Sequence, residues 1–170
     1  MHYDGKVINR MNKFKKTMLC IVYWLISLTW GCLGTIPGLI VALGLSMAGY
    51  RPHRNGYGAI FEIGGNWGGF SMGPISLCGS YYESSRDWYE HTRRHEFGHS
   101  IQQLVLGPFQ ILLVTIPSII RYWYQRIRTA KGLENVPYDQ AIFEYTASKY
   151  GYLWVNAIEN ESKEYTFERK

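Results

Sequence analysis

The residues best suited to chemistry are His95, Glu96 and His99, which form the pattern H-E-x-x-H. On an α-helix His95 and His99 lie one turn apart on the same face, so two imidazoles can reach one metal ion. Glu96 stands beside that face and can take a proton from a water held at the ion. The pattern therefore predicts a zinc site with Glu96 as general base. The alternative is a helix with two surface histidines.

A catalytic zinc ion has three protein ligands and one open position, so a third ligand is expected further along the chain. The candidates are acidic residues: Glu134, Asp139, Glu144 and the acids of the C-terminal tail. Glu144 is favoured because it lies in the middle of a predicted helix, one turn before Ala147. Ala147 and Gly98 are small enough to let two helices approach closely. Asp139 is the second choice, and a structural salt bridge is the alternative for either residue.

Two helices are needed to position these side chains. The first is expected to begin at Ser84 or Ser85 and to end at Gly107, since serine caps helix starts and glycine ends helices. The second is predicted over residues 137–160 and would carry the third ligand. His91 lies one turn before the motif, but three successive turns of imidazole would not converge on one ion. We therefore assign His91 to the surroundings of the site or to the surface.

A small β-hairpin is predicted before the first of these helices. Its strands are residues 59–63 and 70–78, joined by a glycine-rich loop over residues 64–69. Pro74 cannot donate to a strand ladder, so the second strand should be an edge strand or carry a bulge. An exposed edge can hold an extended peptide as an added strand. A purely structural hairpin is the alternative.

Residues 17–50 contain no charged residue and no histidine. A helix needs about 20 apolar residues to cross a bilayer, so this run is too long for one upright span. The Gly- and Pro-containing break favours a helical hairpin of residues 17–33 and 37–48 over a single tilted span. Basic residues on both sides would then place both ends in the cytoplasm. A cleaved signal peptide or a buried pair of soluble helices would also account for the apolar run.

A second uncharged run covers residues 104–120 and contains Pro108 and Pro117. Two prolines in so short a run indicate a re-entrant or interfacial segment better than a clean span. Arginines, tyrosines and a tryptophan follow over residues 121–128, as in belts at the level of lipid headgroups. The predicted zinc helix runs directly into this sequence. We therefore expect the site to lie at or near a bilayer surface.

The charge pattern favours lipid over nucleic acid as the anionic partner. The chain has 170 residues and a formal charge of +5, and its basic residues gather beside the two apolar runs. No nucleic-acid-binding signature is present in the sequence. The three cysteines, Cys20, Cys32 and Cys78, indicate neither a disulfide framework nor a thiolate metal site.

These observations predict a mainly α-helical membrane-associated protein with a small β-hairpin before the H-E-x-x-H helix. Residues 1–55 would form a basic N-terminus with the transmembrane segment. Residues 56–160 would form the metal-binding domain, with a membrane-interacting segment at residues 104–124, and residues 161–170 a charged tail.

The motif His95-Glu96-Phe97-Gly98-His99, with Glu144-Tyr145-Thr146-Ala147 on a later helix, resembles the gluzincin metallopeptidases. Gln102 and Leu106-Gly107-Pro108 follow the first motif. With them, the motif more closely resembles small uncharacterised bacterial membrane proteins with an H-E-Y-G-H-x-x-Q and L-G-P signature. The resemblance implies zincin-like helices, zinc bound by His95, His99 and Glu144, Glu96 as base, and the bacterial cytoplasmic membrane as location. Many gluzincins have an acid where this chain has Ser148. The orienting group should then come from elsewhere, with Asp139 as a candidate.

The expected activity is therefore that of a membrane-anchored zinc metallopeptidase. Four residues are candidates for stabilising the oxyanion, with Tyr145 placed first: Tyr145, Tyr150, Tyr138 and Asn66. The alternative is a membrane scaffold or partner-binding protein whose zinc is structural or absent. Zinc-dependent hydrolysis of a non-peptide bond, such as a lipid or cell-wall amide, is a third hypothesis. The sequence indicates neither the substrate nor the oligomeric state.

Overall fold

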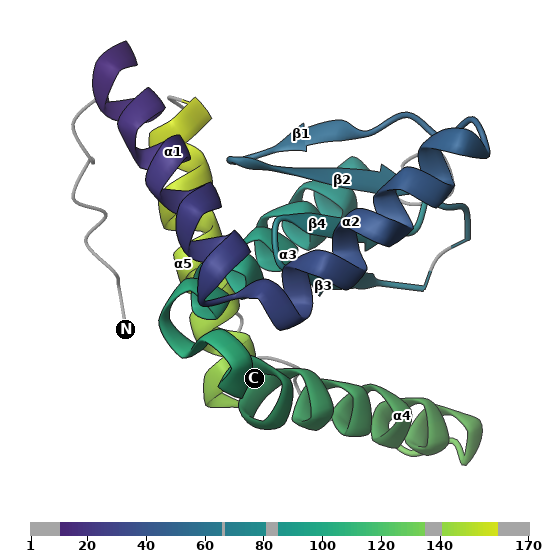
Figure 1. The fold of residues 1–170 in the computed structure, drawn as a ribbon. Coiled ribbons are helices and arrows are strands. Elements are labelled where there is room, and N and C mark those ends of the chain that lie inside the picture. The colour runs from purple at the N-terminus through teal and green to yellow at the C-terminus, as the bar shows by residue number, and fades with distance from the viewer. Residues whose placement is uncertain (1–10, 66, 81–84, 135–140, 160–170) are drawn as a thin grey trace.

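The computed structural model describes residues 11–65, 67–80, 85–134 and 141–159. The chain is mainly helical with one small mixed sheet, which confirms the predicted fold class at that level (Figure 1). Its elements, in order, are α1 (Lys13–Thr29), α2 (Cys32–Met47), β1 (His53–Asn55), β2 (Gly58–Glu62), β3 (Gly69–Met72), β4 (Ile75–Cys78), α3 (Arg86–Leu106), a 3-10 turn (Gly107–Phe109), a π-helical turn (Ile111–Thr115), α4 (Ile116–Ala130) and α5 (Ile142–Glu159).

The strands form a four-stranded sheet in the order β1-β2-β4-β3. The pairs β1-β2 and β3-β4 are antiparallel, whereas β2 and β4 are parallel. The predicted hairpin between residues 59–63 and 70–78 is therefore wrong. The second segment divides at Gly73, which has φ of 62° and begins a tight turn, so that it makes its own hairpin. Pro74 lies in that turn, and β3 is one of the two edge strands of the sheet, with β1 at the other edge.

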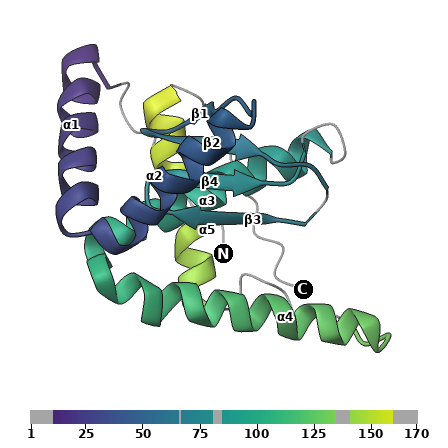
Figure 2. The ribbon, with the colours of Figure 1, turned by 45° about the vertical axis from the view of Figure 1, so that its right-hand side comes forward.

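α2 and α3 pack on opposite faces of the sheet (Figures 1 and 2). On one face Met72 and Ile75 lie against Gly38 of α2, where a Cβ atom would meet both side chains. On the other face Cys78 packs with Tyr89 of α3. α5 packs along α3. The H-E-x-x-H helix thus lies between the sheet and α5, which gives its two sides different neighbours.

α1 and α2 meet at a bend of 101°, so the predicted antiparallel helical hairpin is not formed. The break falls at Gly31, the residue before α2, and Pro37 lies inside α2 rather than at its start. Among the described residues no single helix is long and apolar enough to cross a membrane. Two bent pairs reach that length and composition only together: α1 with α2, and residues 86–109 with 111–130, which bend by 118°.

The predicted ends of the H-E-x-x-H helix agree closely with the structure. Ser85 caps α3 by accepting a hydrogen bond from the Trp88 amide at 3.2 Å, and Gly107 ends the helix with φ of 54°. α5 begins at Ile142. The first residues of the predicted helix over 137–160, and the tail of residues 161–170, lie outside the described part of the chain.

Candidate metal centre

The backbones of α3 and α5 touch at two glycines. A Cβ atom on Gly98 would lie 1.8 Å from the carbonyl oxygen of Ala147, and one on Gly151 would lie 1.8 Å from that of Arg94. No larger residue fits either position without separating the helices. This close approach brings a short carboxylate side chain of α5 to the histidines of α3. The predicted role of Gly98 is confirmed.

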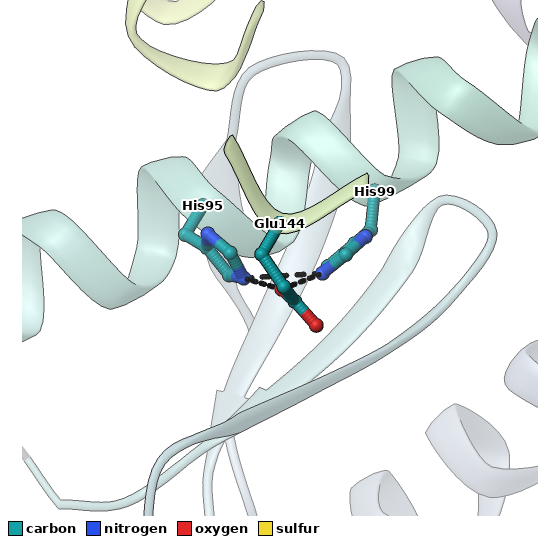
Figure 3. Close-up of side chains that lie close together, drawn as sticks. All are labelled: His95, His99 and Glu144. Atoms are coloured by element: carbon teal, nitrogen blue, oxygen red, sulfur yellow. Dashed lines mark hydrogen bonds and ion pairs between the residues drawn. The ribbon is translucent and has the colours of Figure 1, made fainter. Parts of the chain in front are cut away.

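His95, His99 and Glu144 meet between the two helices (Figure 3). Oε2 of Glu144 lies 3.0 Å from Nε2 of His95 and 3.3 Å from Nε2 of His99. The two Nε2 atoms are 3.1 Å apart. All three side chains are nearly or fully removed from solvent, with Glu144 at 0% exposure. The group selected from the sequence is therefore the group that the fold brings together.

The spacing of these atoms fits a small tetrahedral ion. Ligand bonds of 2.0–2.1 Å at tetrahedral angles put neighbouring ligand atoms about 3.3 Å apart, close to the three distances observed. Oε2 of Glu144 is also buried, and its ion-pair contacts are with the two imidazoles. A buried carboxylate oxygen facing two imidazole nitrogens can be satisfied by a metal ion between them or by a proton on either ring. The cluster could hold a metal ion through His95, His99 and Glu144.

Gln102 fixes the orientation of the His99 ring. Its Nε2 donates to the carbonyl oxygen of Phe143 at 2.6 Å and to the hydroxyl of Thr146 at 2.8 Å. Its Oε1 must therefore face His99, whose Nδ1 lies 2.8 Å away. Since an amide oxygen only accepts, Nδ1 carries a proton, and in the neutral ring Nε2 has its lone pair toward the centre.

Ser148 does the same for His95. Its hydroxyl oxygen lies 2.8 Å from Nδ1 of His95 and accepts a hydrogen bond when that nitrogen is protonated. The expectation that the orienting group must come from elsewhere is therefore wrong, because the serine itself reaches the ring. Asp139, the residue suggested for that role, lies outside the described residues.

The electrostatics of the cluster also favour a cation. Burial disfavours the charged form of His99, but its hydrogen bond to Glu144 and the nearby carboxylates outweigh this and raise its pKa. Burial likewise acts on Glu144, yet the hydrogen bonds and charges of the two imidazoles hold its pKa well below the usual range. Glu144 is therefore ionised at neutral pH, and the space between the rings attracts positive charge.

Glu96 lies on the sheet side of α3, against the edge strand. Ser71 of β3 donates to a carboxylate oxygen of Glu96, and its hydroxyl also lies 2.8 Å from the Glu96 carbonyl oxygen. A Cβ atom on Gly69 would meet Oε1 of Glu96 at 2.4 Å, so only glycine leaves room there. The strand thus fixes the carboxylate beside the histidine pair without adding it to the ligand group.

A cavity of about 390 Å³ opens beside the histidines. Four elements contribute to its lining: β3 with Phe70 and Ser71, α3 with His95, Glu96 and His99, the π-helical turn with Val114, and α4 with Ser118, Ile119, Tyr122 and Trp123. Gln110 lines the cavity as well and donates to the His99 carbonyl oxygen at 3.3 Å. A ligand in this cavity would touch the cluster and Glu96 together.

Known proteins give no further guide. The chain matches no protein-family model, no curated protein and no solved structure. The resemblance to gluzincins therefore stays an expectation drawn from the motifs.

The remaining predicted site residues fall in different places. Tyr145 and Tyr150 of α5 are not among the residues that line the cavity, and Tyr138 and Asn66 lie outside the described residues. His91 stacks against His95 with ring centroids 6.0 Å apart and is not one of the grouped ligands.

Sequence reasoning did not find roles for Ser71, Gln102, Ser118 and Ser148. Gln102 carried a signal, three residues after His99 on the same helix, and Ser148 stood at the position where many gluzincins have an acid. The serines act across long sequence separations, and their type alone predicts no contact.

Proposed function

We propose that the protein is a zinc-dependent hydrolase that cleaves peptide bonds at a lipid surface. One observation carries the proposal: His95 and His99, two of three side chains with the spacing of tetrahedral ligands, line the same cavity as the buried, oriented Glu96. A scaffold has no need for Glu96 at that place, whereas a hydrolase requires a base beside its metal.

His95, His99 and Glu144 would hold the zinc. Zinc in such a site supplies Lewis acidity, which lowers the pKa of a water and polarises a carbonyl. Glu96 accepts the proton of the attacking water, and it later delivers that proton to the leaving amine. Ser71 holds the Glu96 carboxylate for both transfers by donating to one of its oxygens.

The cavity suits a peptide because β3 borders it. Gly69, Phe70 and Ser71 belong to this edge strand, which is paired on one side only. An extended peptide can add to such an edge through backbone hydrogen bonds, with its carbonyl groups beside the centre. Tyr122 also lines the cavity and is a candidate donor to the oxyanion, in addition to Tyr145, which is one of the candidates from the sequence.

The lipid partner is supported by the surface of the first two helices. α1 and α2 expose a large apolar area that includes Leu25, Ile40, Leu43 and Met47. Exposed patches of this size mark protein or membrane contacts. The surrounding sequence has no acidic residue between Asp4 and Glu62, which favours an anionic bilayer.

Metal analysis of detergent-purified protein tests the centre. We expect about one zinc per chain in the wild type and in Glu96→Gln, and its loss in His99→Ala and Glu144→Ala. Glu96→Gln should abolish turnover and trap a bound substrate that mass spectrometry can identify. A metal-free wild type after zinc is added back would contradict the proposal.

The alternative is a membrane scaffold without catalysis. One observation favours it: the ion pairs of Glu144 with His95 and His99 can by themselves join α5 to α3. In that case Glu96→Gln would leave the cellular function unchanged. If the Glu96→Gln protein traps a lipid or a cell-wall amide, this would instead indicate hydrolysis of a non-peptide bond.

A further inference from the structure

α4 is an amphipathic helix that the rest of the described chain leaves uncovered. It has no buried residue, packs mainly against the π-helical turn before it and extends away from the body of the molecule (Figures 1 and 2). Its exposed apolar residues recur every three or four positions and so form one stripe: Ile116, Ile119, Ile120, Trp123 and Ile127. Leu112 and Leu113 extend the apolar surface into the π-helical turn.

The charges around this stripe identify its partner. No acidic residue occurs between Glu96 and Glu134, while α4 carries Arg121, Arg126 and Arg128. Arg126 and Arg128 lie over the rings of Tyr122 and Tyr124 at 5.6 Å. An apolar stripe flanked only by cations suits an anionic lipid surface, whereas two copies of the helix would repel each other.

The length of α4 determines how it can meet such a surface. Its fifteen residues extend for about 22 Å, less than the roughly 30 Å of a bilayer core. A helix this short, with three arginines, cannot cross the core but can lie in the headgroup layer with its stripe facing the acyl chains.

α4 is also a wall of the metal cavity. Ile119 and Trp123 line the cavity and belong to the exposed stripe. On the opposite face Ser118 donates a hydrogen bond to Glu144. A surface that holds α4 would therefore hold both the cavity wall and a partner of the third ligand.

We propose that α4 lies in the headgroup layer of an anionic bilayer, so that the metal cavity opens at the lipid surface and receives polypeptide bound to that membrane. The choice of substrate rests on the proposed function. The docking of α4 does not, because it follows from the stripe and its charges alone.

Site-specific fluorescence tests the docking directly. Cys20→Ala and Cys32→Ala first remove two native cysteines that a label could reach. A single cysteine is then introduced by Ile127→Cys on the stripe or by Thr129→Cys on the opposite face. Cys78 is fully buried and stays unlabelled. Each variant carries an environment-sensitive fluorophore in nanodiscs of phosphatidylcholine with or without phosphatidylglycerol. A nitroxide on the acyl chains quenches probes at the lipid, and iodide quenches probes in water.

The nitroxide should quench the probe at position 127 several-fold more than the probe at 129, with a larger difference when phosphatidylglycerol is present. Iodide should show the reverse order. Equal quenching by the nitroxide at both positions would overturn the docking. Strong nitroxide quenching at both positions would mean an embedded helix, and no nitroxide quenching at either would mean a helix away from the lipid. In detergent, the probe at position 127 could also become protected from iodide as the protein concentration rises. That result would assign the stripe to a second copy of the chain instead.

Cleavage assays with zinc-loaded protein in the same nanodiscs test the substrate class. A quenched fluorescent peptide library is compared when tethered to a lipid and when free. We expect faster cleavage of the tethered library, and loss of that preference in Ile127→Glu but not in Thr129→Glu, which adds the same charge to the other face. Equal cleavage of both forms would overturn the membrane-bound substrate while keeping the hydrolase. If neither peptide library is cleaved while the nitroxide still quenches the probe at position 127, the proposal of a hydrolase and its substrate class would be overturned. The docking of α4 at the lipid would remain.

Discussion

The hydroxyl of Ser148 lies 2.8 Å from Nδ1 of His95. Ser148 follows Glu144 by one turn on α5. One turn of α5 therefore provides both a ligand candidate and the group that orients a second one. A neutral hydroxyl in this position holds the ring without adding a negative charge to the buried cluster.

Ser148→Ala should weaken zinc binding by about 10- to 100-fold, because His95 loses the partner that fixes its ring. Competition with a fluorescent zinc chelator measures the affinity. Ser46→Ala is the control, since that hydroxyl donates to the Ala42 carbonyl oxygen on exposed α2. Equal affinities of wild type and Ser148→Ala would show that the contact does not support the site.

Gln102→Leu should also weaken zinc binding by about 10- to 100-fold, because the proton on Nδ1 of His99 loses its acceptor. The variant also removes the hydrogen bond to Phe143, so the free energy of unfolding should fall even without zinc. Denaturant titration of the zinc-free protein separates the two effects. Unchanged stability would mean that Gln102 does not link α3 to α5.

Gly98→Ala should destabilise the protein by about 1–3 kcal/mol, since the added methyl group would overlap the Ala147 carbonyl oxygen. Separation of α3 from α5 also moves Glu144 from the histidines, so the zinc content should fall. Gly44→Ala is the matched control, because no atom lies within 4 Å of the added methyl group there. That variant should gain up to about 1 kcal/mol from helix propensity. Equal unfolding midpoints for the two variants would contradict the close packing.

The free energy of unfolding should decrease as the pH rises above 9. Burial raises the pKa of the Cys78 thiol from 9.0 to about 12, with smaller contributions from Glu62 and Glu96, and burial also raises the pKa of Tyr89. Above pH 9 the unfolded chain releases protons that the folded protein retains, so the free energy of unfolding decreases as pH rises. Denaturant midpoints between pH 8 and pH 11 measure the trend. Cys78→Ala should flatten the trend and Cys20→Ala should not; the same slope in all three proteins would exclude Cys78 as a cause.

The sequence alone determined the residues of the candidate centre. Helical periodicity put His95 and His99 on one face, and the small residues Gly98 and Ala147 indicated that α5 could bring Glu144 to them. Such patterns are local, since they depend on the repeat of a helix and on the size of side chains at one contact. The limits of α3 were equally local, because its cap residues act within one turn.

The tertiary structure decided what depends on distant segments. The parallel pairing of β2 with β4, the bend between α1 and α2, and the position of α4 beside the cavity all join residues whose contacts no local pattern records. The support from Ser71, Ser118 and Ser148 is of the same kind. A serine forms hydrogen bonds in almost any setting, so only the packing of the helices and the sheet shows which of them reach the centre.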